Sequence, residues 1–190
     1  MSTTSPQPRP RSPAPPRATR LPTSPRRPAT EAEAKAVASA IRLRVLRVCL
    51  DQPMTNQEIA ARLEAHPATV LHHVRRLVAT GFLAPQPARR GARGAREIPY
   101  LATRKSWTLD LGDRRGDRPM IDAFLQEIEL VDPKDEVAVS RLGLRLTPQE
   151  YGEVVHRLSE LLDELARRPP SPDGRPYSMF LAIHPDPGRS

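Results

Sequence analysis

The residues most able to do chemistry lie together in the stretch HPATVLHHVRRL, from His66 to Leu77. It holds three of the chain's five histidines, including the adjacent pair His72 and His73. Histidine can ligate a metal, transfer a proton or donate hydrogen bonds from a surface. Catalysis is disfavoured, because no Ser or Cys nucleophile is nearby in the sequence and neighbouring residues of one helix point in different directions. No glycine-rich phosphate loop opens a helix after a strand either. We therefore expect a non-enzymatic protein.

Helical spacing divides this stretch into two faces. The apolar stripe, predicted to be buried, consists of Val70, Val74, Leu77 and Val78, with His73 at its edge as a packing residue. The residues predicted to contact DNA are Ala68, Thr69, Leu71, His72, Arg75 and Arg76. Small, hydrogen-bonding and cationic side chains suit a major groove. A solvated amphipathic helix would look the same, so this face needs a second feature beside it.

The second feature is an arginine-rich loop, ARRGARGAR, between two stretches that are compatible with β-strands. Its predicted DNA contacts are Arg89, Arg90, Arg93 and Arg96. The flanking stretches predict a β-hairpin that extends to Leu111, with Leu101, Trp107 and Leu109 on one side of the second strand. A basic hairpin tip can lie along a phosphate backbone or enter a minor groove. Helix and hairpin together favour nucleic-acid binding.

Three capping boxes mark where helices should begin, at Thr30–Glu33, Thr55–Glu58 and Thr147–Glu150. The first predicts a single helix from Thr30 to about Asp51. The second predicts a short helix from Asn56 to Leu63. A tight turn, Glu64-Ala65-His66, then leads to a helix over Pro67–Thr80, which Gly81 ends. Two short helices across a turn, with one helix before and a hairpin behind, predict a winged helix-turn-helix.

Short matches over residues 35–111 carry a family resemblance. They are RLRVL from Arg42, NQEIA from Asn56, PATV from Pro67, HVRRLV from His73 and GFL from Gly81. The chain resembles ArsR-type winged-helix transcription regulators, which implies double-stranded DNA as the partner and a packing role for His73. Glu64 departs from the pattern, since a glycine with positive φ is common there. The recognition helix also lacks the Cys-x-Cys of arsenic-sensing members, so we expect no metal and no cofactor.

Charge is unevenly distributed along the 190 residues, whose net charge is +8. Residues 1–30 hold six arginines, nine prolines and no acid, which predicts a disordered arm over 1–29. Residues 31–111 carry +6 and residues 112–190 carry −4. A basic middle favours a polyanion through counterion release. The single cysteine, Cys49, excludes an internal disulfide, and no apolar run is long enough for a membrane span. We expect a soluble cytoplasmic protein.

Residues 112–190 are predicted to form an α/β dimerisation segment. A helix is expected over Pro119–Leu130, and strands are candidates over 137–146 and 177–184. A helix over 147–168 carries a two-repeat heptad seam. Its predicted homodimer contacts are Tyr151, Val154, Leu158, Leu161 and Leu165, with support from the first helix around Val37–Ile41. Glu153, His156 and Glu160 share this helix with metal-like spacing, but a solvated face is the commoner origin of such a set.

The predicted fold is α+β, with a winged helix-turn-helix at residues 30–111 followed by the smaller dimerisation segment. The predicted function is a homodimeric DNA-binding transcription regulator. Two alternatives stay open: a winged helix that docks a protein partner, and a sensor of the same family. In the sensor, a small-molecule effector would lie among Met120, Phe124, Met179 and Phe180.

Overall fold

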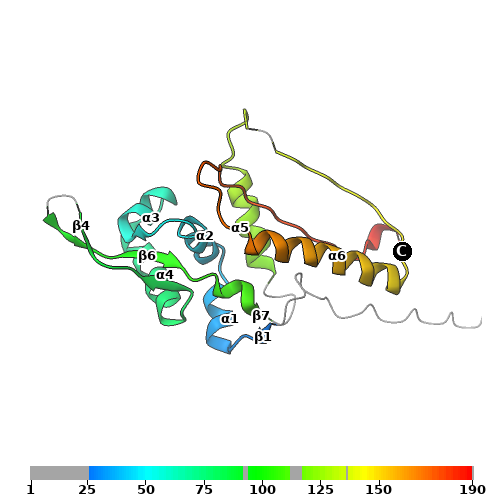
Figure 1. The fold of residues 1–190 in the computed structure, drawn as a ribbon, viewed down its shortest axis with the longest axis horizontal. Helices are drawn as coiled ribbons and strands as arrows, with labels where there is room; N and C mark the ends of the chain where they lie inside the picture. Colours follow the sequence, from blue (N-terminus) through cyan, green and yellow to red (C-terminus); the bar gives the residue numbers. More distant parts are fainter. Residues whose placement is uncertain (1–25, 92–93, 112–116, 136, 190) are drawn as a thin grey trace, which may run out of the picture.

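The computed structural model describes residues 26–91, 94–111, 117–135 and 137–189 (Figure 1). Its α-helices are α1 (Glu31–Val37), α2 (Ala40–Val48), α3 (Asn56–Arg62), α4 (Pro67–Ala79), α5 (Arg118–Ile128) and α6 (Pro148–Arg167). Its strands are β1 (Arg27–Pro28), β2 (Met54–Thr55), β3 (Leu83–Pro85), β4 (Arg89–Arg90), β5 (Arg96–Glu97), β6 (Pro99–Ala102) and β7 (Leu109–Asp110). Two 3-10 turns, η2 (Lys105–Thr108) and η4 (Pro187–Arg189), complete the elements. None of these helices is long and apolar enough to cross a bilayer.

A three-stranded antiparallel sheet has β6 at its centre, between β2 and β3. Beyond it, β4 and β5 pair as a separate antiparallel hairpin, which we call the wing (residues 89–97). The wing projects from the end of the molecule opposite α6 (Figure 1). Helices α2, α3 and α4 contact one another, and α3 and α4 form the helix-turn-helix. The predicted α+β winged helix-turn-helix is confirmed.

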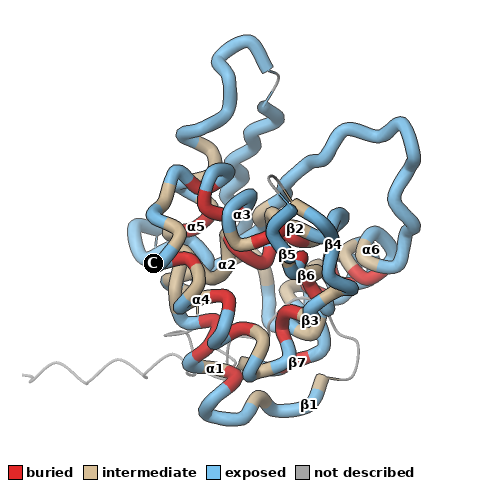
Figure 2. Tube along the Cα trace, turned by 90° about the vertical axis from the view of Figure 1, so that its left-hand side faces the viewer, coloured by how far each residue is buried: buried red, intermediate tan, exposed pale blue. Residues whose placement is uncertain are grey.

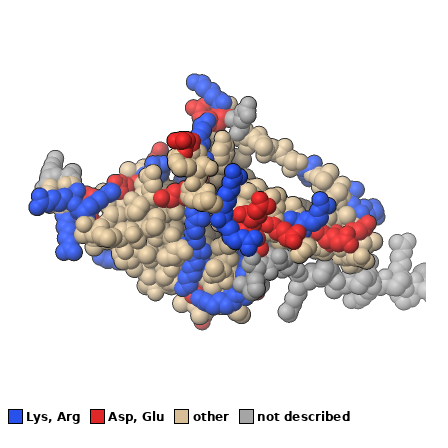
Figure 3. Space-filling view, in the orientation of Figure 1, with Lys and Arg blue, Asp and Glu red and all other residues tan. Residues whose placement is uncertain are grey.

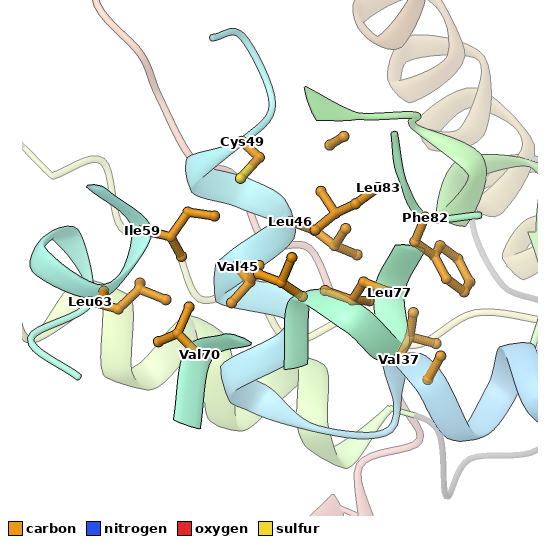
Figure 4. Close-up of a cluster of buried hydrophobic side chains, with 14 of the residues drawn as sticks. Val37, Val45, Leu46, Cys49, Ile59, Leu63, Val70, Leu77, Phe82 and Leu83 are labelled. Atoms are coloured by element: carbon orange, nitrogen blue, oxygen red, sulfur yellow. The ribbon is translucent and has the colours of Figure 1, made fainter. Parts of the chain in front are cut away.

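The core of this domain is drawn from all three helices and from the sheet. Side chains of α2, α3 and α4 converge on one another in Figure 4, with Val45, Ile59 and Val70 fully buried among them. Phe82 and Leu83 close the core at the beginning of the sheet. Burying one such aliphatic side chain stabilises a fold by about 1.5–3 kcal/mol. Buried residues are concentrated here, whereas the long C-terminal connections are exposed (Figure 2).

All three predicted capping boxes are present. In each, the threonine side chain accepts a hydrogen bond from the N3 backbone, and the N3 glutamate accepts one from the threonine's own backbone N–H. The pairs are Thr30/Glu33, Thr55/Glu58 and Thr147/Glu150. Each pair satisfies two backbone donors that the helix cannot satisfy itself. A local sequence pattern was therefore enough to place the beginnings of α1, α3 and α6.

The prediction of one helix from Thr30 to Asp51 is wrong, because the chain breaks at Ala38–Ser39 into α1 and α2. The side chain of Arg42 reaches back from α2 and donates to two carbonyls at the end of α1. Its Nη2 lies 2.8 Å from the Lys35 oxygen, and its Nε contacts the Ala36 oxygen. The break lets Val37 and Val45 enter the same core. The side-chain cap offsets the backbone hydrogen bonds that are lost at the break.

The predicted second hairpin strand up to Leu111 is also wrong beyond Ala102. Arg104 adopts a positive φ of 59°, the 3-10 turn η2 follows, and Trp107 is exposed. β7 then pairs in parallel with β1, at the N-terminal side of the domain. The Ala29 backbone N–H extends this ladder to the Asp110 oxygen at 2.8 Å. Residues 27–29 thus belong to the folded domain, although the sequence suggested an arm up to residue 29.

The C-terminal part is only partly as expected. α5 lies close to its predicted range and packs on α2, and α6 follows its capping box as predicted. The strand candidates 137–146 and 177–184 are not strands. Both run as irregular chain, with no backbone hydrogen bond to another backbone group among the described residues. β-compatible composition does not form a ladder unless a neighbouring strand is available.

Candidate nucleic-acid interface

The start of α4 is fixed by contacts from the turn and from α3. His66 is the N-cap, and its Nδ1 accepts a hydrogen bond from the Ala68 backbone N–H at 3.3 Å. Asn56 Nδ2 donates to the Pro67 oxygen at 2.9 Å, which ties the first residue of α3 to the first residue of α4. Glu64 takes the predicted left-handed conformation with φ of 50°. These contacts set the angle between the two helices.

The other end of α4 is anchored to the beginning of β3 and to η2. Gly81 has a φ of 72°, and the following Phe82 N–H donates back to the Leu77 oxygen at 2.9 Å. This is the αL ending that the glycine predicted. Lys105 Nζ donates to the Thr80 oxygen at 2.7 Å, so a cation sits at the negative end of the helix dipole. The sheet and α4 are therefore held as one unit.

Burial along α4 confirms the predicted stripe. Val70, Val74 and Leu77 are fully buried, and Val78 is half-buried. On the other side the residues predicted to contact DNA are exposed, namely Ala68, Thr69, His72, Arg75 and Arg76. Leu71 is half-buried, so less of it is available to a ligand. The exposed face is small at its N-terminal end and cationic further along.

The two adjacent histidines lie in different environments. His73 is half-buried, and its Nδ1 is buried without a hydrogen-bond partner among the described residues. Desolvation, followed by the nearby charges of Arg42 and His72, lowers the pKa of His73. His72 is exposed, and the two rings meet edge to face at 5.6 Å between centroids. A histidine kept neutral by burial suits the predicted packing role.

The wing presents arginines in an unfavourable pairing. Arg90 and Arg96 are exposed and stand directly opposite each other across β4 and β5. Like charges at opposite positions of an antiparallel pair destabilise it. An anion lying between them would remove that repulsion. Arg93 lies outside the described residues. Figure 3 shows blue side chains gathered at this end of the molecule.

Arg89 differs from the other wing arginines because it is already paired. It contacts Glu58 Oε1 at the start of α3, and its Nε lies 3.9 Å from Glu97 on the opposite strand. Glu58 Oε2 accepts the Thr55 backbone N–H at 2.7 Å. That hydrogen bond is the main reason that the pKa of Glu58 is lowered, and Arg89 adds to it. Sequence reasoning missed this link: the capping box revealed Glu58, but a pairing 31 residues away leaves no local pattern.

Sequence reasoning also missed a cluster of charged side chains that joins β1 and α1 to η2. The carboxylate of Glu33 is nearly buried and is bridged by both guanidinium nitrogens of Arg27, at 2.6 and 2.9 Å. Lys105 Nζ lies 2.7 Å from the same carboxylate, and the Thr30 N–H donates to it at 2.8 Å. Hydrogen bonds from Arg27, then Lys105 and Thr30, hold the pKa of Glu33 far below its usual range.

The residues proposed for dimerisation fall into two groups on α6. Tyr151, Val154 and Leu158 are half-buried, whereas Leu161 and Leu165 are 48% and 41% exposed. The helix buries a neighbouring stripe instead, formed by Val155, Ser159 and Asp163. In α1, Val37 is already buried in the core of its own domain, so the surface expected around Val37–Ile41 is largely used.

The alternative sites are not assembled in the described part of the chain. His156 Nε2 lies 3.4 Å from Glu160, while Glu153 accepts from Gln149 at 3.2 Å. No group of three His, Cys, Asp or Glu residues gathers for a metal there. Burial raises the pKa of the Cys49 thiol to about 12, which leaves it an unreactive core residue.

The residues suggested for an effector pocket are likewise divided. Phe124 and Phe180 stack directly on each other, with ring centroids 5.0 Å apart, so they fill the space between them. Met120 and Met179 are more than a third exposed. The strands that were expected to complete the pocket are not formed.

Comparison with protein families matches the part of the chain that contains α3 and α4. A family model described as a helix-turn-helix domain matches residues 37–86. Comparison with curated proteins gave no match.

Solved structures with partial likeness include reduced HlyU from Vibrio cholerae N16961 (20% identity, TM-score 0.31, 50% of this chain and 84% of that one). The transcriptional regulator SlyA has 17% identity and a TM-score of 0.28, with 66% and 74% covered. The multiple antibiotic-resistance repressor from Listeria monocytogenes 4b F2365 has 17% identity and a TM-score of 0.30, with 71% and 81% covered. The matched helix-turn-helix domain is a binding module and not an enzyme. Because it is followed by the wing, the chain carries a winged helix-turn-helix of the kind found in DNA-binding transcription regulators.

Proposed function

We propose that the chain is a sequence-specific, homodimeric transcription regulator of the ArsR type. In this proposal α4 enters the major groove and the wing contacts the phosphate backbone or the minor groove. The sequence resemblance over residues 35–111 supports the family assignment. A sensor function and a metal are not part of the proposal, since the residues suggested for them do not come together.

The exposed face of α4 is the observation that carries the proposal. Arg75 and Arg76 are exposed, and neither takes part in an ion pair among the described residues. Arg76 lies close enough to contribute, after desolvation, to the lowered pKa of Arg42. Unneutralised cations beside small residues at a helix N-terminus match what base edges and phosphates accept.

The wing supplies a second cationic surface, through Arg90 and Arg96. The N-terminus of α3 and the wing are joined through Glu58 and Arg89, so both surfaces move as one body. Dimerisation through the exposed leucines of α6, Leu161 and Leu165, would place two such bodies side by side. Two half-sites read together give higher specificity than one.

The proposal is tested with Arg75→Ala plus Arg76→Ala. Each protomer loses two phosphate or base contacts, so the dimer loses four, and affinity for a selected genomic operator should fall at least about tenfold while the salt slope of binding decreases by up to about 4. Binding is measured by electrophoretic shift over a range of salt concentrations. Arg167→Ala plus Arg168→Ala is the matched control, since both are exposed at the end of α6 and remove the same charge.

Unchanged affinity and slope in the Arg75/Arg76 variant would contradict the proposal. A winged helix that docks a protein would show only weak binding that disappears at moderate salt, with no selected operator.

A further inference from the structure

The two halves of the molecule differ in how well they cover their own apolar side chains. Between residues 26 and 111 the large hydrophobic residues that remain exposed are Ile98 and Trp107 among the described positions. Between 117 and 189 there are many more, including Val139 at 81%, Leu142 at 75% and Tyr177 at 83%. Exposed apolar surface of this extent in a folded protein indicates an interaction site.

Half of these exposed residues lie in two lengths of chain, segment A (residues 137–146) and segment B (residues 177–184), and the others lie on α5, just after it and on α6. In segment B the large apolar residues Tyr177, Met179 and Leu181 stand at every second position and are exposed, as is Ser178 between two of them, while Phe180 stacks on Phe124. Segment A shows the same spacing at Val137 and Val139 and again at Leu142 and Leu144, with a shift of one residue between the pairs. Alternation of this kind is the pattern of a β-strand.

The backbone of both segments is also without partners. No N–H or C=O of either segment is hydrogen-bonded to another backbone group in the part of the chain that the structure describes. Segment B is nevertheless fixed in place, since Ser178 Oγ lies 3.4 Å from Glu127 and Phe180 stacks on Phe124 of α5. A fixed apolar segment with strand-like spacing and no backbone partner is a template for pairing with another such segment.

Within one chain the two segments do not pair. They run in the same direction beside α6, from the α5 side toward the C-terminus (Figure 1). They approach each other toward their far ends, where the Arg189 side chain lies against Gly143. Neither segment therefore has a strand partner in the part of the chain that the structure describes.

We propose that a second copy of this chain covers this surface, with segments A and B of the two copies adding to one another in an intermolecular β-sheet. This inference rests on the homodimer of the proposed function and gives it a second, larger interface. A second copy brings the same two unpaired segments, so a two-fold axis gives every exposed strand a partner.

The charges of segments A and B favour a second copy of the chain as the partner. Segment A carries Arg141 and Arg145 and no acid, and segment B carries no Asp, Glu, Lys or Arg. Pairing A of one copy with B of the other therefore opposes no like charges. The exposed acids of α6 include Glu153, Glu160 and Glu164, which lie within the same half of the molecule. Figure 3 shows red side chains over that helix. These acids complement the two arginines of segment A.

Backbone amide hydrogen exchange of the full chain tests the pairing directly. At concentrations where sedimentation shows a dimer, amides of both segments should exchange at least about a hundredfold more slowly than in unstructured peptide. Dilution into the monomer range should remove that protection. Fast exchange in the dimer overturns the inference, and so does protection that persists in the monomer, because the sheet would then be internal.

Substitutions supply a second measurement. Val139→Asp plus Met179→Asp should raise the dimer dissociation constant at least about a hundredfold, since each change acts twice in a symmetric interface. Ile98→Asp is the control and should leave the dimer unchanged. Ile98 is an exposed apolar residue between β5 and β6, far from segments A and B in the sequence. Circular dichroism verifies that each variant retains its helices.

The outcome can be separated from that of the DNA-binding proposal. The Arg75/Arg76 variant should remain a dimer with protected segments, whatever its affinity for DNA. If the Val139/Met179 variant remains as tight a dimer as the native chain, this inference fails while the proposed function stands. Dimers that dissociate only on Leu161→Asp plus Leu165→Asp would assign the interface to α6 alone and also overturn the β-pairing.

Discussion

Individual residues of the turn carry strain that substitution can relieve. Glu64 holds a φ of 50°, a conformation that costs a residue with a Cβ roughly 1 kcal/mol. The position could be foreseen, because the spacing of the two helices requires a left-handed residue between them. The sequence could not show why glutamate is there, and nothing in the structure explains it.

Glu64→Gly should stabilise the domain by up to about 0.5 kcal/mol, since the relief of roughly 1 kcal/mol of strain exceeds the extra entropy of the unfolded chain. Thermal unfolding of the two proteins at the same pH measures the difference. Arg62→Gly, at an exposed position in the last turn of α3, is the matched control and should destabilise the domain by a similar amount. A decrease in stability for Glu64→Gly would show that this glutamate makes a contact that outweighs the strain.

Glu33 makes the stability of the domain sensitive to acid. Its folded pKa lies far below the unfolded value, so its contribution is fully present above about pH 4.5 and diminishes as the pH falls toward the folded pKa. Glu33→Gln should therefore lower the melting temperature at pH 7 and have a smaller effect at pH 3. Glu31→Gln, an exposed neighbour paired with Lys35, is the control. Equal losses for Glu33→Gln at both pH values would contradict the assignment.

At the scale of elements, local signals were enough for helix starts and not for helix breaks. Thr55 and Glu58 are three residues apart, and their capping box could be recognised from that spacing alone. The division of α1 from α2 depends on Arg42 capping carbonyls six and seven residues earlier, and periodicity ran through it unbroken. The strand that was predicted to reach Leu111 ends at Ala102 as β6, because β7 pairs with β1 instead, a contact between distant parts of the sequence.

In the candidate site, too, local sequence patterns could be predicted and tertiary contacts could not. Which face of α4 is exposed depends on a 3.6-residue period, so the outward positions of His72, Arg75 and Arg76 could be predicted. Which wing arginine is free depends on tertiary contacts, so the pairing of Arg89 with Glu58 could not.

The wing should respond to removal of its carboxylate partner. Glu58 occupies Arg89 in the free protein, so a phosphate that binds Arg89 must compete with it. Glu58→Gln should raise affinity for non-specific DNA about two- to tenfold and steepen the salt slope by up to about 1. Fluorescence anisotropy with a random duplex measures both. Glu64→Gln is the control, because it removes the same charge near α4 without touching Arg89. An equal rise in affinity for Glu64→Gln would mean that the change in net charge, and not the release of Arg89, causes the effect.

At the scale of the whole molecule, the opposite charges of the two halves separate their tasks. Residues 31–111 carry a net charge of +6 and residues 112–190 a net charge of −4. Figure 3 shows blue side chains at the wing end and across the middle of that face, and red side chains beside blue ones over α6. The acidic half should stay away from the phosphate backbone and leave the symmetric pair of α4 helices to read DNA.

A bound operator should therefore show two protected half-sites related by two-fold symmetry, with centres about 10 base pairs or a multiple of that apart. Hydroxyl-radical footprinting on a selected fragment measures this spacing. Protection of a single half-site at saturating protein would contradict a symmetric dimer.

If segments A and B pair two copies as proposed, their uncovered apolar residues also affect how the protein responds to its own abundance. At low dosage most chains are single, and the number of complete pairs rises with the square of chain concentration. Doubling the supply then nearly quadruples the occupied form, until pairing saturates. A shortage has a different consequence, because single chains with bare strand edges are the species most exposed to aggregation and degradation. The same strip of side chains, Val139, Leu142 and Tyr177 among them, thus sets both a threshold for action and a limit on the lifetime of unpaired chains.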